Sequence, residues 1–395
     1  MQPGPEPRTY NPLECLGWSA LQVGTPDAQG MGQSIMPLSE LISLLPHLFL
    51  AQAEPSVLSR LQVEGGVDAY YGYDFNRPAS ATSFLPGTGT TARRHSEASV
   101  NLASLGVSLA PEPVGARVLL GFGTGMDVLH RAEPEGDATG PEVWRYVQQA
   151  SLSFAEGPLT LEAGIFPSHI GLESFQSQLN WTYTRSWMGE FSPYYQTGLK
   201  GTWRFDERWS AQLHLINGWQ TIGDNNSGKA LGTQVAYAGD RLSATVNTFV
   251  GNEGTGAAEA LRLFIDTVIT FKVSEVVSVA ATVDAGRQAR PGETAALWYA
   301  AGANVRVRLA RPVAVTARAE VYCDRDGLMS GTAQTLTEGT LTLELKPAER
   351  LTLKAEARHD RSTQAVFDSH DTDADGLPRQ RPNQTLLVVG AVAYF

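Results

Sequence analysis

Apolar and polar residues alternate along most of the chain, from Leu61 to its end. In the segment 351–358, for example, Leu, Leu, Ala and Ala alternate with Thr, Lys, Glu and Arg. Alternation over four to eight residues already predicts a strand with one buried face. Here the alternation commonly continues for ten or more residues, about the length of a strand that crosses a bilayer at a tilt.

The apolar runs and the breakers between them predict about sixteen such strands. Their expected ranges are 61–75, 94–109, 114–125, 142–156, 158–166, 194–204, 209–220, 229–238, 241–252, 258–272, 275–288, 295–309, 312–325, 333–347, 350–361 and 383–395.

The connections between these segments alternate in length. Tight turns such as Gly239-Asp240 and Ala348-Glu349 are followed by longer polar stretches, of which 167–193 and 362–382 are the longest. Outer-membrane barrels show this alternation, with long extracellular loops and short periplasmic turns. The pattern therefore predicts an all-β protein, a transmembrane antiparallel up-and-down β-barrel of about sixteen strands. A pair of soluble β-sandwiches would also alternate, but its strands would be shorter and its connections less asymmetric.

Composition agrees with a barrel and excludes several other classes. The longest apolar runs are well below the roughly 18 residues that a membrane-spanning helix needs. Only 2 Cys are present, too few for a disulfide framework. The formal net charge of −11 gives no basic footprint for a nucleic-acid partner.

The first 53 residues differ from the rest and are expected to be a leader. Leu41 to Leu50 is mostly apolar, and Ala51-Gln52-Ala53 has the small-x-small form of an export cleavage site. We expect translation to begin at Met31 or Met36 and a signal peptide to end near residue 53. This leaves 54–395 as the barrel; a short amphipathic helix is the alternative interpretation of 38–53.

The barrel prediction assigns a direction to each side chain. The apolar member of each pair should face lipid and the polar member should face the lumen, which sixteen strands leave wide enough for water. Aromatic residues near strand ends should form belts at the membrane interfaces. The expected belt residues are Tyr70, Trp144, Trp209, Trp298, Tyr394 and Phe395.

The segment 164–220 resembles the OmpL-like β-barrel porin family. The similarity lies in Gly164-Ile165-Phe166, Ile170 to Glu173, Asn180 with Tyr183 to Ser186, and Asn217-Gly218-Trp219; further matches are Arg318 to Tyr322 and the terminal Phe395. The resemblance covers most of 61–395 and implies passive transport in an outer membrane, without naming a solute. It also implies that the terminal aromatic residue is read by the barrel-assembly machinery.

Charged rings in a lumen decide which ions pass. Counted from the short turns, six polar-face residues are the expected pore-lining set: Arg262, Asp266, Arg318, Glu320, Glu356 and Arg358. Arg306, Arg308, Lys346 and Lys354 are expected nearer the periplasmic mouth. Because acidic and basic residues stand side by side, the sequence leaves anion or cation preference open. For any one of these residues, merely hydrating a polar wall is an equally good interpretation.

The connection from Pro167 to Pro193 is the candidate constriction. A connection this long usually has a function or is disordered, and its aromatic residues argue against disorder. We expect it to fold into the lumen through six residues: Glu173, Phe175, Trp181, Tyr183, Arg185 and Trp187. The alternative is an extracellular flap that packs on the rim.

Other candidate chemistry is weak. Asp371, Asp373 and Asp375 precede Gly376 in the pattern that opens a calcium loop, but the closing Glu is missing because residue 382 is Pro. His169 and Ser174 share one loop, and nothing indicates a third catalytic group. No cofactor is expected, and we do not expect an enzyme.

The sequence is therefore interpreted as an outer-membrane porin of a Gram-negative bacterium. Its expected partners are outer-membrane lipid, small hydrophilic solutes or ions, and the assembly machinery; the oligomeric state is open. The alternatives are a plugged barrel whose surface loops bind a partner or act in adhesion, and an outer-membrane hydrolase.

Overall fold

The computed structural model describes residues 57–136, 139–256, 258–373 and 375–395. The chain divides into two compact units, residues 1–61 and 62–395. Of the first unit only the short helix α2 (Val57–Arg60) and Leu61 are described. The expected leader, 1–53, lies outside the described residues.

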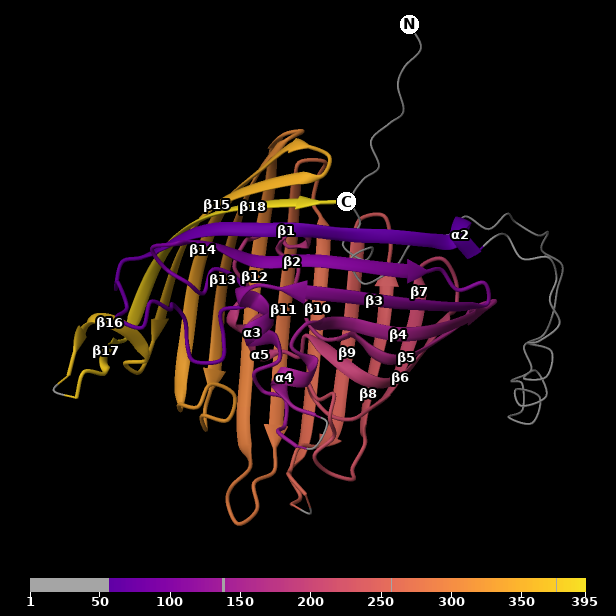
Figure 1. The fold of residues 1–395 in the computed structure, drawn as a ribbon, viewed down its shortest axis with the longest axis horizontal. Helices are drawn as coiled ribbons and strands as arrows, with labels where there is room; N and C mark the ends of the chain where they lie inside the picture. Colours follow the sequence, from indigo (N-terminus) through magenta and orange to yellow (C-terminus); the bar gives the residue numbers. More distant parts are fainter. Residues whose placement is uncertain (1–56, 137–138, 257, 374) are drawn as a thin grey trace, which may run out of the picture. The chain divides into compact units, whose positions relative to one another are not determined.

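The second unit is a closed barrel of sixteen antiparallel strands, and this confirms the predicted architecture. The strands follow one another in chain order around the barrel, and β18 closes it against β1 (Figure 1). Their bounds are β1 Leu61–Asp74, β2 Ala98–Leu109, β3 Val114–Phe122, β4 Val147–Glu156, β5 Leu159–Pro167, β6 Tyr195–Arg204, β7 Trp209–Ile216, β8 Ala230–Ala238, β9 Leu242–Asn252, β10 Leu261–Lys272, β11 Val277–Gln288, β12 Ala296–Ala310, β13 Val313–Asp324, β14 Gln334–Ala348, β15 Leu351–Ser362 and β18 Asn383–Tyr394.

The long connections hold short elements that the alternation did not predict. They are α3 (Thr124–Leu129), α4 (Pro141–Trp144), the 3-10 turn η3 (Ser177–Leu179), α5 (Trp187–Phe191) and the hairpin of β16 (Phe367–Thr372) and β17 (Pro378–Arg381). The hairpin extends beyond the ends of β15 and β18 (Figure 1). Among the described helices, none has the length and apolar character to cross a membrane.

Some strands are shorter than expected, and β3 and β4 show why. The sequence predicted this strand to residue 125, but the chain turns away at Gly123, which has φ +128°. A Cβ at this position would lie 2.5 Å from the backbone oxygen of Asn101, so only glycine fits. β4 likewise starts at Val147 rather than residue 142, because 141–144 form α4.

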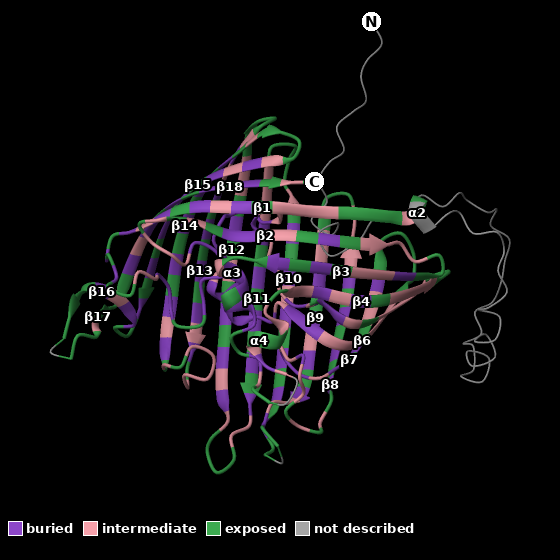
Figure 2. Cartoon of the chain, in the orientation of Figure 1, coloured by how far each residue is buried: buried purple, intermediate pink, exposed green. Residues whose placement is uncertain are grey.

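The two faces of the wall have opposite chemistry, as expected for a barrel in lipid. On β14, Leu341 and Leu343 are exposed on the outer face, while Thr340 and Thr342 on the inner face are buried. Figure 2 shows this alternation of exposed and buried residues along the strands. The apolar residues thus surround a polar interior, the reverse of a soluble protein.

Tyr70, Trp144 and Trp298 are not in the expected belt. Trp144 lies in α4 and packs against a buried cluster that includes Met126. Trp209 and Phe395 are exposed on the outside, but Tyr70 and Trp298 are 3% and 2% exposed. Tyr70 alternates with the outward-facing Tyr71 and therefore points inward, where its ring lies 6.2 Å from that of Tyr183. Tyr70 lies at a position along the strand that suits a belt, but it belongs to the inward-facing set of alternating residues.

Candidate functional site

The connection between β5 and β6, residues 168–194, bonds to the inward-facing side of the wall; we call it the inner loop. Its partners are Asp68 on β1, Asp266 on β10, Arg318 and Glu320 on β13, and Lys354, Glu356 and Arg358 on β15. β10 and β1 are separated by six strands in the barrel order. The inner loop therefore lies across the lumen and not on the rim.

The Glu356 carboxylate fixes the middle of the inner loop by accepting hydrogen bonds from the backbone of the loop. One carboxylate oxygen accepts the Tyr183 N–H at 2.6 Å, and the other accepts the Thr184 N–H at 3.0 Å. The Thr342 hydroxyl donates to the same carboxylate at 2.7 Å. A carboxylate with several donors of this kind is well compensated for its burial.

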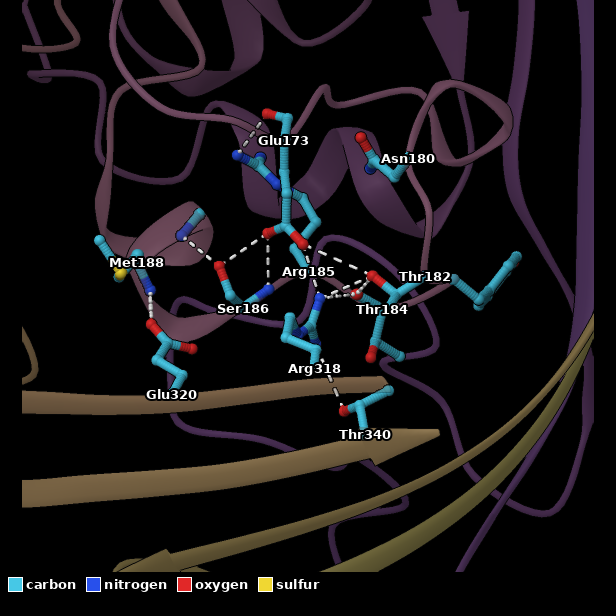
Figure 3. Close-up of polar contacts among 12 residues, drawn as sticks. Glu173, Asn180, Thr182, Thr184, Arg185, Ser186, Met188, Arg318, Glu320 and Thr340 are labelled. Atoms are coloured by element: carbon cyan, nitrogen blue, oxygen red, sulfur yellow. Dashed lines mark hydrogen bonds and ion pairs between the residues drawn. The ribbon is translucent and has the colours of Figure 1, made fainter. Parts of the chain in front are cut away.

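Glu320 holds the start of α5 in the same way. It accepts the backbone N–H group of Trp187 at 2.7 Å. It also accepts that of Met188 at 2.5 Å (Figure 3). The Ser186 side chain caps this short helix by accepting the Gly189 N–H at 3.0 Å. The local sequence thus starts the helix, and the barrel wall fixes where it lies.

Arg318 joins the wall to the inner loop through its guanidinium. Nη1 donates to Glu173 Oε1 at 2.6 Å and to the Thr184 carbonyl at 2.7 Å (Figure 3). Nε donates to Glu338 Oε1 at 2.7 Å. The Arg318 side chain is 1% exposed. A planar group with five donors suits this bridging position, where the single point charge of a lysine would not.

Arg358 and Lys354 complete the contact on β15. Arg358 donates to the Arg185 carbonyl and, at 2.8 Å, to Asp360 Oδ1. The Lys354 ammonium donates to the carbonyls of Ser177 at 2.7 Å and Asn180 at 2.6 Å. Lys354 was expected nearer the periplasmic mouth, and its long side chain carries the ammonium to the inner loop.

The structure brings five of the six expected pore-lining residues to the inner loop and leaves Arg262 apart. Asp266 accepts the Gly171 N–H at 2.9 Å. Arg262 lies near the extracellular end of β10, where it donates to Gln288 at 2.8 Å and stacks over the Trp219 ring at 5.0 Å. The role of the six expected pore-lining residues in selecting solutes stays a prediction.

The six residues expected in the constriction have different environments. Tyr183 and Trp187 are fully buried, and Trp187 Nε1 donates to Asp360 at 2.9 Å. Arg185 lies over the Tyr194 ring at 4.2 Å, and Phe175 meets the same ring edge to face. Trp181 is only half-buried. Glu173 binds Arg318, as described above.

Several residues of this network were not predicted from the sequence. Asp68 accepts the Tyr183 hydroxyl at 2.7 Å and the Ser177 hydroxyl at 2.5 Å. Asp360 and Glu338 pair with Arg358 and Arg318. The sequence does place all three on the inward-facing set of alternating residues in their strands. That alternation alone does not identify their partners.

Two other connections pack against the inner loop and its neighbourhood. Glu190 of the inner loop accepts the backbone N–H groups of Gly89 at 2.9 Å and Thr90 at 3.1 Å. Glu133, in the connection after α3, accepts the Ile222 N–H at 3.0 Å, and burial raises the pKa of this carboxyl. Burial also lowers the pKa of the neighbouring His130 to about 4.

The three aspartates of the calcium-like motif do not converge. Asp371 pairs with Arg381 at 3.3 Å, and Asp373 accepts the backbone N–H groups of Asp375 and Leu377. Within the described ranges, no three His, Cys, Asp or Glu side chains form a group that could hold a metal ion.

His169 and Ser174 are not brought together either. The two ring nitrogens of His169 lie 2.9 Å from Gln196 Oε1 and 3.0 Å from the Thr248 carbonyl. The Ser174 hydroxyl accepts the Gln176 N–H at 3.2 Å. Both side chains thus have local structural partners, and no nucleophile–base pair is formed by these two residues.

Comparisons with known proteins agree with the fold. A family model described as "Putative beta-barrel porin-2, OmpL-like" matches residues 60–395. A search of curated proteins gave no match.

Solved porin structures are similar in fold at low sequence identity. An anion-selective porin from Comamonas acidovorans has 14% identity and a TM-score of 0.56, covering 85% of this chain and 99% of its own. The trimer form of OmpT from Vibrio cholerae has 10% identity and a TM-score of 0.53, covering 85% and 99%. The outer-membrane channel DcaP of Acinetobacter baumannii has 12% identity and a TM-score of 0.52, covering 85% and 97%.

The resemblance noted in the sequence is confirmed by the family match, and the closed β-barrel agrees with that match. The protein is therefore a channel of the outer membrane. The chain belongs to the OmpL-like β-barrel porin family and serves passive diffusion across the outer membrane.

Proposed function

We propose that the inner loop sets the size limit of this porin and that small hydrophilic solutes or ions pass beside it. The observation that carries the proposal is the pair of anchors at distant wall positions, Asp266 to the Gly171 N–H and Asp68 to the Tyr183 hydroxyl. A segment tied on both sides of a lumen narrows it.

The wall residues Arg318, Glu320, Glu356 and Arg358 then act mainly by fixing the inner loop. Arg318 and Arg358 each have carboxylate partners within 2.8 Å, and the carboxylates of Glu320 and Glu356 accept backbone N–H groups. Charges that are paired this closely present a weak field to a passing solute. Their contribution to selectivity is therefore indirect, through the position of the loop.

Conductance across a planar lipid bilayer tests the proposal. The full chain, folded in detergent, is expected to give discrete ohmic steps in KCl, smaller than those of a variant that lacks residues 172–188. Equal step sizes for the two proteins would refute the inner loop as the constriction.

A plugged barrel that binds a surface partner is the second candidate, and the burial of the inner loop favours it. Trp187, Tyr183 and Thr184 of the inner loop are each fully buried against the wall or neighbouring loops. Absence of conductance from protein shown to be folded in the bilayer would support this candidate and reject open diffusion.

Export and assembly complete the proposal. A signal peptide within 38–53 would direct the chain across the inner membrane. The terminal Phe395 is 57% exposed, so an assembly factor could reach it. A trimer is proposed by analogy with the trimer form of OmpT. N-terminal sequencing of the mature protein and crosslinking in membranes test these points.

A further inference from the structure

A small cavity lies between the inner loop and the wall formed by β10 to β13. It has about 20 Å³ of water-sized space. Its lining includes Asp266 and Asp284, with Asn304 and Glu320 on the neighbouring strands. A space of this size holds one water molecule or one small ion.

The side chains of Asp266 and Asp284 lie against each other, and Oδ1 of each receives no hydrogen bond from another described residue. The two residues are directly opposite each other in the register of β10 and β11. Asp266 is 0% exposed and Asp284 is 4% exposed. Like charges directly opposite on neighbouring strands repel, and buried charges without partners are costly.

The rest of the lining adds negative charge and oxygen ligands. Glu173 and Glu320 also line the cavity, and Arg318 is the one basic residue among the described residues that do so. The Arg318 guanidinium already bonds Glu173 and Glu338. The described lining thus offers no further cationic side chain to neutralise the aspartate pair.

The neutral residues around the pair suit a hard cation. Thr282 lines the cavity and its hydroxyl donates to the Met188 sulfur, with 3.4 Å between oxygen and sulfur, so its oxygen lone pairs stay available. Asn304 supplies an amide on the next strand. Carboxylate, hydroxyl and amide oxygens are the ligands that hard cations prefer.

We propose that this cavity, centred on Asp266 and Asp284, binds a small inorganic cation in transit, and that the channel consequently favours cations over anions. The inference rests on the proposed function, because it assigns the charge class of the solute that passes the inner loop. A proton shared between the two carboxylates is the competing occupant, and it would leave the pair with less charge.

Reversal potentials in a KCl gradient test the inference. The full chain in a planar bilayer is expected to show a K⁺ over Cl⁻ permeability ratio above one. The variants Asp284→Asn and Asp266→Asn/Asp284→Asn should lower this ratio by about two-fold or more, because they remove charge from the cavity. The variant Asn304→Asp should raise it, and this gain cannot result from misfolding.

The matched control is Glu259→Gln, which removes one carboxylate from an exposed position just before β10. It should leave the ratio unchanged. A conducting wild-type channel that prefers anions, or aspartate variants with an unchanged ratio, would overturn the cation site while leaving the porin function intact. A folded protein without conductance would overturn both the proposed function and the site.

Discussion

Arg318 on β13 and Glu173 in the inner loop form an ion pair of 2.6 Å whose side chains are 1% and 9% exposed. The pair connects the wall to a segment about 145 residues earlier in the chain. Because both groups are out of water, each depends on the other for compensation of its charge.

Replacing Arg318 with Met should loosen the inner loop. The change leaves Glu173 and Glu338 without their guanidinium, and breaking a buried pair in this way costs about 3–5 kcal/mol. We expect a lower free energy of unfolding and larger, noisier single-channel currents. Denaturant titration and bilayer recordings measure the two effects.

The control is Arg325→Met, one residue beyond the end of β13, where the side chain is exposed. It should change the unfolding free energy by less than about 0.5 kcal/mol. If both variants behave alike, the ion pair does not hold the loop.

Trp187 should be the main apolar anchor of the inner loop. Its ring stacks on Phe191 at 6.0 Å, and the Arg358 guanidinium lies 5.0 Å from its centre. Trp187→Ala should reduce the unfolding free energy by about 3–5 kcal/mol. Trp187→Phe, which loses the hydrogen bond to Asp360 but keeps an aromatic ring, should cost clearly less; equal losses would show that packing is unimportant there.

A lysine on the lipid-facing side should be costly in the wall and harmless in a loop. Leu341 on β14 and Leu377 in the β16–β17 hairpin are 55% and 62% exposed. Leu341→Lys should destabilise the barrel in lipid by about 2–4 kcal/mol if it lies near the bilayer midplane. Leu377→Lys should be neutral, and refolding titrations in vesicles compare the two variants.

Acid should release the segment around α3. The Nε2–H of His130 donates to the Val147 carbonyl at 2.8 Å, and burial lowers the pKa of His130 from 6.5 to about 4. Between these pH values the unfolded segment binds a proton that the folded segment does not, so stability falls as the pH falls from 6.5 to 4. The loss amounts to about 3 kcal/mol.

Hydrogen exchange of the amides in 124–133, corrected for intrinsic rates, measures this release. Protection in the wild type should decrease from pH 6.5 to pH 4. His130→Gln should remove most of this dependence, because glutamine does not titrate. An equally steep decrease in the variant would assign the effect to other groups.

The wall of the barrel could be predicted from the sequence because its physics is local. Each strand of β13 to β15 shows its two faces in a run of alternating residues, and the parity of Arg318 or Glu356 follows directly. Where the prediction was too long, at Gly123 and at α4, the cause was also local: a backbone conformation open only to glycine, and a helical turn.

The contacts of the inner loop could not be predicted in the same way. That Glu356 would hold the N–H groups of Tyr183 and Thr184 depends on how a loop folds in three dimensions, and no periodicity records it. The contact of Lys354 with the inner loop could not be predicted for a similar reason, since counting residues along a strand gives the depth of a Cα and not of an ammonium four carbons away.

The seam between β1 and β18 limits the order of events during assembly. Gly66 pairs with Tyr394 and Asp74 with Leu386, so the first strand finds one of its neighbours only when the last strand has arrived. Until then both edges carry unpaired backbone groups that lipid cannot satisfy. The strands therefore cannot be inserted into the membrane one by one as they are synthesised from the N-terminus. A chain that stops a few residues short would keep an open edge, and it could not close into a smaller barrel.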